Sequence, residues 1–279
     1  MSQPGVTRRQ AFERRQKRRS VLIALTSTVI VIGLVVALVP QTPGWYKVKR
    51  SFFDGAVLSD TFSKLLSAFT KDIQIFLWCA PCILIWGMTL AICRSVRTPA
   101  LFPLRLFAAA YTDIFRGIPV ILTILLVGFG VPGLGLHRPW NSPYLWGSVA
   151  LVLAYSSYVA EVFRAGIESV HESQRAGARS LGLSSGQTLR FVIIPQAVRR
   201  VIPPLMNDFV SLQKDVALIS LIGPIEILRQ AGIDKSKYAN FTPYVGAAII
   251  FLLLTIPETR FVDHLMTRER RRTSGTAVR

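Results

Sequence analysis

Long apolar runs constrain this sequence more than any other feature. Ser20 to Val39 is almost unbroken, and comparable runs cover about Ile73 to Cys93, Tyr144 to Ala160 and Val201 to Gly223. A helix needs roughly 20 mainly apolar residues to cross the hydrocarbon core of a bilayer. With 51% hydrophobic residues, the chain also holds more apolar material than a soluble domain needs. These runs predict an all-α, polytopic integral membrane protein.

Two further segments complete about six transmembrane helices. Leu101 to Tyr111 is apolar but is interrupted by Pro103 and Arg105, so we interpret it as an amphipathic lead-in to a span at Ile118 to Val131. The last span is expected at about Tyr244 to Ile256.

The basic residues predict the orientation. Most of the 33 lysines and arginines fall in segments that lie on one side of a six-span chain, including residues 1–19 and 260–279. Basic loops remain in the cytoplasm, so both termini are expected there. The net charge of +18 is interpreted as topology and contact with lipid headgroups, not nucleic-acid binding, because no nucleic-acid motif accompanies it.

The expected organisation has four parts. Residues 1–19 form a basic cytoplasmic tail, and residues 20–71 form the first membrane helix and an external segment rich in interfacial aromatic residues. Residues 72–260 form the membrane core, which includes the segment 171–195, and residues 261–279 a second basic cytoplasmic tail. A cleaved signal peptide is the alternative for the first run, but its apolar region is usually shorter and a cleavage site follows it.

A polar stretch from Glu161 to Pro204 separates two of the spans and is too regular to be a simple connector. Ser173 is expected to cap a short helix that ends at Gly182, and Ser184 to Gln187 matches the S-x-x-Q capping box of a second helix. We therefore predict a cytoplasmic helical hairpin with a tight turn at Gly182 to Ser185. Its second helix runs on toward Ile194.

Three prolines follow the hairpin. Pro195, Pro203 and Pro204 lie where the chain enters the fifth span. Because proline lacks an N–H group and its ring clashes with the preceding turn, these residues are expected to break or redirect the helix.

The spacing in this stretch resembles the EAA loop of ABC importer permeases. Ala176-Gly177-Ala178, three residues, Gly182, nine residues and Val192-Ile193-Ile194-Pro195 match the family pattern E-A-A, three residues, G, nine residues, I-x-L-P. The flanking segments 158–167, 179–184, 188–200, 203–215 and 111–119 are similar to the polar amino acid branch of the family. The resemblance covers roughly residues 72–260, although Ala176 stands where the family has Glu.

The resemblance implies how this chain works. Residues 171–195 would be the coupling loop that docks on a cytoplasmic ATPase, with the following residues carrying the motif: Ala176, Gly177, Ala178, Arg179, Ser180, Leu181, Gly182, Leu183 and Pro195. The implied partners are ABC ATPase subunits, a second permease subunit (identical or related), an external solute-binding protein and the lipid bilayer. The implied cargo is a small polar solute, with amino acids favoured and other polar solutes still open.

The chain itself is not expected to be an enzyme or to hold a cofactor. It has no G-x-x-x-x-G-K-[ST] sequence and no Gly-Lys pair, so ATP and Mg²⁺ would be bound by the partner ATPase. His137, His171 and His264 are scattered without the spacing of metal ligands. The three cysteines lie in one apolar run and are interpreted as free thiols inside a membrane helix.

Charged residues inside spans are expensive and often functional. Asp208, Lys214 and Asp215 lie in the fifth span and either line a translocation pathway or form structural ion pairs. Lys214 and Asp215 are expected to have different partners, because adjacent helical residues do not face each other. Glu161, at the end of the fourth span, either lines the inner gate or lies in the interface. We expect Asp113 and Arg116 to form a local ion pair.

Two other classes of function remain as alternatives. A secondary transporter or channel would work without ATP, and many such proteins contain paired halves with broken helices, which this sequence does not show convincingly. A membrane-anchored enzyme would need a cluster of catalytic residues. The hairpin favours an ATP-driven importer over both.

Overall fold

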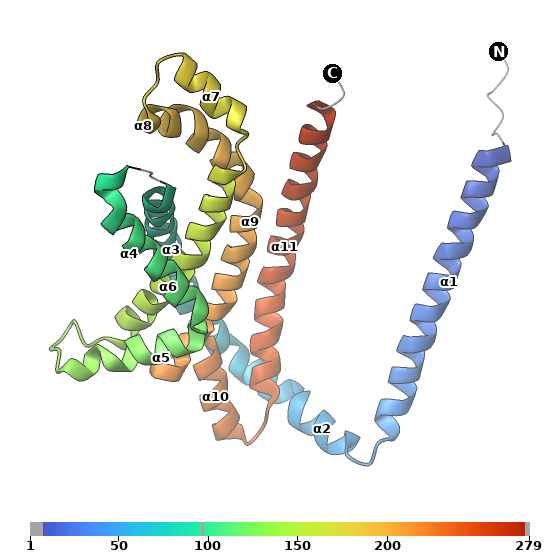
Figure 1. The fold of residues 1–279 in the computed structure, drawn as a ribbon. Helices are drawn as coiled ribbons and strands as arrows, with labels where there is room; N and C mark the ends of the chain where they lie inside the picture. Colours follow the sequence, from blue (N-terminus) through green and yellow to red (C-terminus); the bar gives the residue numbers. More distant parts are fainter. Residues whose placement is uncertain (1–7, 96–97, 277–279) are drawn as a thin grey trace. The chain divides into compact units, whose positions relative to one another are not determined.

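The computed structural model describes residues 8–95 and 98–276, and the side chains of residues 16–95 and 98–267. All secondary-structure elements in this part of the chain are helices, and it contains no strand. It divides into two compact units at Asp54 and Gly55 (Figure 1). Each unit is therefore described separately.

The first unit contains one long helix and one short one. α1 (Arg8–Leu38) is followed by the 3₁₀ turn η1 (Val39–Gln41) and by α2 (Trp45–Phe52). α1 begins twelve residues before the predicted span at Ser20, so part of the expected basic tail is helical; residues 1–7 of that tail lie outside the described residues. The apolar side chains of α1 are exposed within the unit, as a helix facing lipid requires.

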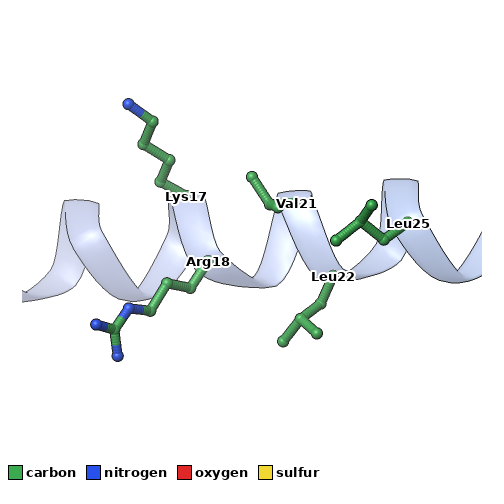
Figure 2. A pocket seen from close by; sticks show the side chains of 5 residues that line it. All are labelled: Lys17, Arg18, Val21, Leu22 and Leu25. Atoms are coloured by element: carbon green, nitrogen blue, oxygen red, sulfur yellow. The ribbon is translucent and has the colours of Figure 1, made fainter.

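The amino-terminal boundary of this apolar surface is visible in Figure 2. Lys17 and Arg18 extend from α1 one turn before Val21 and Leu22 and two turns before Leu25, and all five side chains come from the same helix. The hollow that they line is therefore a helix surface with no second wall. The change from basic to apolar side chains is typical of a membrane interface.

The second unit holds the rest of the described chain. Its elements are α3 (Gly55–Ser95), η2 (Pro99–Leu101), α4 (Phe102–Gly117), α5 (Val120–Gly130), η3 (Pro132–Leu134), α6 (Pro143–Glu168), α7 (Glu172–Ser180), α8 (Ser185–Thr188), the π-helix η4 (Leu189–Ile193), α9 (Ile194–Asp215), η5 (Val216–Ile222), α10 (Ile227–Tyr238) and α11 (Thr242–Thr276). In Figure 1, α7 and α8 lie at one end of this unit, and α5 and α10 lie toward the other.

The number of candidate spans agrees with the prediction. Among the described residues, 4 helices are long and apolar enough to cross a membrane, and the count rises to 6 if each of two bent pairs forms one span. The fold is therefore an all-α membrane fold, as the apolar runs predict.

α3 is much longer than its apolar run indicates. The expected span begins at Ile73, but the helix begins at Gly55, and the expected boundary between residues 71 and 72 lies inside it. The first half is amphipathic: Leu65 and Phe69 pack with Ile227 of α10 and Ala247 of α11 in a small second core. A search for continuous apolar runs misses such a helix because only one of its faces is apolar.

The third span is broken. α4 and α5 meet at an angle of 106°, with Ile118 and Pro119 between them. α5 has 11 residues and is about 16 Å long, which is too short to cross a hydrocarbon core of roughly 30 Å alone. The prediction of a separate span at 118–131 is therefore wrong, and α4 with α5 is one bent span or a re-entrant element.

The prolines near the fifth span do not break the helix as predicted. Pro203 and Pro204 lie inside α9, and Pro195 lies in its first turn. The π-helix η4 ends at Ile193, immediately before α9. A wider turn at this point accommodates Pro195, which cannot donate a hydrogen bond to the preceding turn. The backbone is consequently helical from Ser185 to Ile222.

α6 is the central helix of the main core, packing against α3, α5 and α9. Its predicted span at Tyr144 to Ala160 is confirmed, with eight more residues at the end. Close approach to α3 depends on Gly87, where an added Cβ would lie 2.6 Å from Cγ1 of Val159. The glycine is therefore required by packing and not by backbone conformation.

Gly87→Ala is expected to destabilise the protein by about 1–3 kcal/mol, because the methyl group overpacks the contact with Val159. The apparent Tm in detergent should fall by roughly 3–10 °C in a thermal unfolding assay. Gly33→Ala in α1, where nothing lies within 4 Å of the added Cβ, is the matched control and should leave the Tm unchanged or raise it slightly, because alanine favours a helix over glycine. Equal Tm values for both variants would contradict the packing argument.

Candidate functional site

The hairpin (residues 171–195) begins with a side-chain cap on α7. His171 is the N-cap residue, and its Nδ1 accepts a hydrogen bond from the backbone N–H of Ser173 at 3.2 Å. The prediction of Ser173 as the cap is therefore wrong by two residues. Histidine is an unusual cap, and its ring nitrogen replaces the oxygen that Ser, Thr, Asp or Asn would supply.

The turn after α7 closes as a Schellman motif. The N–H of Gly182 donates to Arg179 O at 2.9 Å, and the N–H of Leu183 donates to Ala178 O at 3.2 Å. Gly182 has φ of +82°, a left-handed conformation that residues with a Cβ rarely adopt. The prediction of a helix end at Gly182 is confirmed.

The second arm starts with the predicted capping box. The N–H of Gln187 donates to Ser184 Oγ at 3.3 Å, while the N–H of Ser184 donates to Gln187 Oε1 at 2.9 Å. The N–H groups of Ser184 and Gln187, at the start of α8, thus both find hydrogen-bond acceptors within the same turn. The Schellman motif and the capping box together fix the shape of the turn between Ser180 and Ser185.

Much of the hairpin surface is exposed. Ala176, Gly177, Arg179 and Ser180 are exposed, and so is Leu181 at the tip, where 83% of the residue surface is accessible. Few single apolar side chains in the described chain are as open. The other motif residues differ: Ala178 is buried, Leu183 is half-buried and Pro195 is exposed.

Charge on α7 comes from a residue other than the one expected in the motif. Ala176 provides no carboxylate, but Glu172, one turn earlier, pairs with Arg179 at 3.2 Å and with Arg175 at 3.7 Å. These pairs are exposed and contribute little to stability. They neutralise part of the basic surface of α7.

Hydrogen bonds anchor the hairpin to α6, and the end of α6 to α9. Arg175 Nη2 donates to Ile167 O at the end of α6 at 3.1 Å, and Arg200 of α9 donates to the carbonyl and hydroxyl oxygens of Ser169. Beneath them, α6 and α9 approach closely at Gly166, where an added Cβ would collide with Val201. Movement of the hairpin is therefore linked to α6 and α9 together.

Glu161 joins three helices. Its carboxylate pairs with Arg94 of α3 at 3.3 Å, with Arg116 of α4 at 3.6 Å and with Arg164 of its own helix. The expected local pair between Asp113 and Arg116 is absent from the described residues, because Arg116 turns toward α6 instead. Glu161 thus neutralises one of three converging arginines and fastens the ends of α3 and α4 to α6.

The charged residues of the fifth span have separate surroundings. Asp215 accepts a hydrogen bond from Tyr155 of α6 at 2.8 Å. Oδ2 of Asp208 is buried and has no hydrogen-bond partner among the described residues, whereas Lys214 is exposed. Lys214 and Asp215 thus differ in exposure, and the expectation that they have different partners stays a prediction. Asp208 and Asp215 are two turns apart, so both face roughly the same side of α9.

A buried acidic pair, formed by Asp72 and Glu226, was not identified from the sequence. Asp72 is 1% exposed and Glu226 is fully buried. Glu226 caps α10 by accepting from the N–H groups of Leu228 and Arg229, and Asp72 of α3 accepts from the N–H of Ile227 at 3.3 Å. The pair therefore holds the start of α10 against α3. Asp72 lies beside the expected start of a span, so its burial was not visible in the sequence.

Comparison with known proteins identifies the family. Residues 83–271 match the family described as binding-protein-dependent transport system inner membrane component. The chain belongs to this family. It is the multi-pass inner-membrane permease component of an ABC transporter and not the ATPase, as the absence of a P-loop predicts.

Individual relatives agree with this assignment. The chain is 31% identical to the probable glutamine ABC transporter permease protein GlnM of Bacillus subtilis (strain 168), covering 76% of this chain and 96% of that protein. It is 34% identical to the glutamate transport system permease protein GluC of Corynebacterium glutamicum, covering 71% and 91%. The permease is thus similar to nearly the whole length of both relatives, while part of its own length lies outside the matches.

Solved structures show the same fold. An amino acid ABC transporter determined with histidines has a TM-score of 0.69 and 30% identity, covering 77% of this chain and 98% of that chain. The MetNI methionine ABC transporter has a TM-score of 0.55 at 17% identity and therefore supports the fold alone. Permeases of this family work with ATPase subunits, which use ATP, and with a solute-binding protein.

Gly182→Ala is expected to loosen the hairpin turn, because a left-handed residue with a Cβ costs about 1–2 kcal/mol. Hydrogen–deuterium exchange of the amides at 182 and 183 should become several-fold faster. Gly186→Ala is the control: Gly186 lies in α8 with nothing within 4 Å of an added Cβ, so exchange there should not increase. Unchanged exchange in Gly182→Ala would refute the role given to Gly182.

Proposed function

We propose that this permease imports a polar amino acid, with glutamine and glutamate the leading candidates. The proposal is supported chiefly by relatives that match almost their whole length: the glutamine permease of Bacillus subtilis and the glutamate permease of Corynebacterium glutamicum. The amino acid transporter with 30% identity and a TM-score of 0.69 supports the same class of cargo.

In this proposal the hairpin is the docking element for the ATPase. It lies at one end of the membrane helices, its turn is fixed by two capping motifs, and it presents the exposed Leu181 (Figure 1). Burying a leucine side chain contributes about 1.5–3 kcal/mol. A rigid turn carrying one apolar side chain suits insertion into a groove of a partner subunit.

Closure of the ATPase would reach the membrane through α6 and α9. Arg175 ties the hairpin to α6, Arg200 of α9 bonds to Ser169 at the end of α6, and the contact at Gly166 keeps the two helices together. A second permease subunit, identical or related, would supply the other half of the pathway. ATP and Mg²⁺ would be bound by the ATPase subunits.

Glu161, Asp208, Lys214 and Asp215 are proposed to serve the pathway or its gate. Asp208 offers an unpaired buried carboxylate oxygen that suits a cationic ammonium group, and the exposed Lys214 suits a carboxylate. Glu161 would act as a latch, since it holds α3 and α4 against the helix that leads into the hairpin.

The proposed topology places the hairpin and both termini in the cytoplasm. The basic residues of the hairpin and of the two tails support it. The proposed division of the chain remains the basic tails 1–19 and 261–279, the first helix with its external segment, and the core 72–260. Residues 277–279 of the second tail lie outside the described residues.

Leu181→Asp should abolish docking, because a charged side chain at the hairpin tip opposes burial in an apolar groove. Co-purification with the cognate ATPase and ATP-dependent uptake in proteoliposomes should both fall more than tenfold. Leu134→Asp is the matched control: Leu134 is 78% exposed but belongs to η3, far along the chain from the hairpin. ATPase binding that survives in Leu181→Asp would contradict the docking role.

The cargo is tested with the assembled transporter and its solute-binding protein in proteoliposomes. Uptake of labelled glutamine or glutamate should require ATP on the side of the bilayer where the ATPase is bound. An excess of the unlabelled amino acid should suppress this uptake. Uptake of neither amino acid would refute the proposed cargo. Uptake that persists without any ATPase would favour a secondary transporter instead.

A further inference from the structure

Two buried acidic side chains meet where α10 begins. Asp72 of α3 is 1% exposed and Glu226 is fully buried, and the two side chains lie within hydrogen-bonding reach of each other. Among the described residues, no lysine or arginine forms an ion pair with either carboxyl group. Two adjacent carboxylates that are buried without a cation repel each other strongly, so one of the pair is expected to be neutral.

The hydrogen bonds of Glu226 identify it as the charged member. Its Oε2 accepts a hydrogen bond from the N–H of Leu228 at 2.9 Å, and its Oε1 accepts one from the N–H of Arg229 at 2.7 Å. Both oxygen atoms therefore act as acceptors, which is the role of a carboxylate. The N-terminus of α10 also carries a partial positive charge that favours an anion at this position.

Asp72 has the surroundings of a neutral acid. Its Oδ2 accepts a hydrogen bond from the N–H of Ile227 at 3.3 Å. Its Oδ1 is buried and receives no hydrogen bond from the N–H and O–H groups of the described residues. The group within its reach is the carboxyl of Glu226, which is itself an acceptor. A proton on Oδ1 gives this buried oxygen a partner, because the resulting O–H group can donate to Glu226.

We propose that Asp72 and Glu226 share one proton, bound at Oδ1 of Asp72, and that this proton locks the start of α10 to α3. The protonated Asp72 donates to the carboxylate of Glu226 and accepts from the N–H of Ile227. A hydrogen bond from a neutral acid to a carboxylate is stronger than one between two neutral groups. Loss of the proton leaves two anions in one buried site, and the lock opens.

The lock lies at a bend in the chain. The helical segment that ends at Ile222 meets α10 at an angle of 53°. Just before α10, the hydroxyl of Tyr144 of α6 donates to the carbonyl of Ile225 at 3.1 Å and accepts from the N–H of the same residue at 3.0 Å. The bend is thus fastened to α6 by hydrogen bonds of a tyrosine, and to α3 by a bond of Asp72 that needs a proton.

The other ionisable groups around the lock are exposed or have partners of their own. The exposed cations nearby are Lys64 and Lys71 of α3 and Arg229 of α10. Within α10, Asp234 accepts a hydrogen bond from Nε2 of Gln230 at 2.9 Å. The sequence of η5 contains no ionisable residue, and residues 242–256 of α11 contain one, Tyr244, which packs in the small second core. The pair therefore depends on its own proton for neutralisation.

Infrared spectroscopy of the full-length protein in bilayers tests the proton directly. A protonated carboxyl group has a C=O stretching band that carboxylates and amides lack, and deuterium exchange of its proton shifts this band. At neutral pH, the spectrum of the wild type minus that of Asp72→Asn should show the band with the intensity of one carboxyl group. Lys71→Gln changes the exposed neighbour of Asp72 and should keep the full band. Absence of the band from the difference spectrum would overturn the proposal.

Hydrogen–deuterium exchange measures the lock itself. Because opening releases one proton, protection of the amides of residues 227–229 should fall above neutral pH by up to about tenfold per pH unit, after correction for the intrinsic exchange rate. The amide of Asp72→Asn can donate and accept as the protonated acid does, so this variant should keep the protection and lose the pH dependence. A wild type without the slope would contradict the lock. Protection that collapses when choline replaces Na⁺ would assign a bound cation and not a proton.

Glu226→Gln tests which member of the pair carries the charge. Glutamine offers one acceptor oxygen to two N–H groups, so protection of the amides of Leu228 and Arg229 should fall at neutral pH by about tenfold, the effect of one unsatisfied buried N–H group. Asp72→Asn should leave the protection of these amides unchanged. Equal losses in the two variants would overturn the assignment of the proton to Asp72.

Discussion

Close packing around α6 is the constraint on which the rest of the permease depends. One side of α6 meets α3 at Gly87, and its last turns meet α9 at Gly166. At both positions the space of a side chain is occupied by a valine of the neighbouring helix. Helices in lipid have no hydrophobic driving force to bring them together, so they associate through such close contacts of small residues. Ser169 and Val170 then connect α6 to the hairpin.

The polar groups follow the same helix. Tyr155 holds Asp215 of α9, and six residues later Glu161 gathers Arg94 and Arg116 from α3 and α4. Within a bilayer, each of these groups is costly unless it is paired. Their partners lie on three different helices, so a shift of α6 alone would break several pairs together. These pairs therefore favour movement of the helices as a group.

The sequence allowed prediction of features with a local or compositional cause. Apolar runs located α6, and the capping box at Ser184 needed only its own four residues. It did not allow prediction of features decided by tertiary contacts. The first half of α3 is stabilised by packing of Leu65 against α10 and α11. Arg116 pairs with Glu161 of α6 and not with Asp113, its expected partner on the same helix. The spacing of residues within one segment contains neither fact.

Ala176 shows how a motif residue is lost without loss of the element. The shape of the hairpin depends on backbone hydrogen bonds at Gly182 and on Ser184, not on the side chain at 176. Glu172 supplies a carboxylate one turn away, but it is already paired with Arg179. In the proposed docking, recognition would therefore depend less on a free acidic group of α7 and more on the exposed Leu181. An apolar anchor is also insensitive to salt, so coupling of this kind would hold across a range of ionic strength.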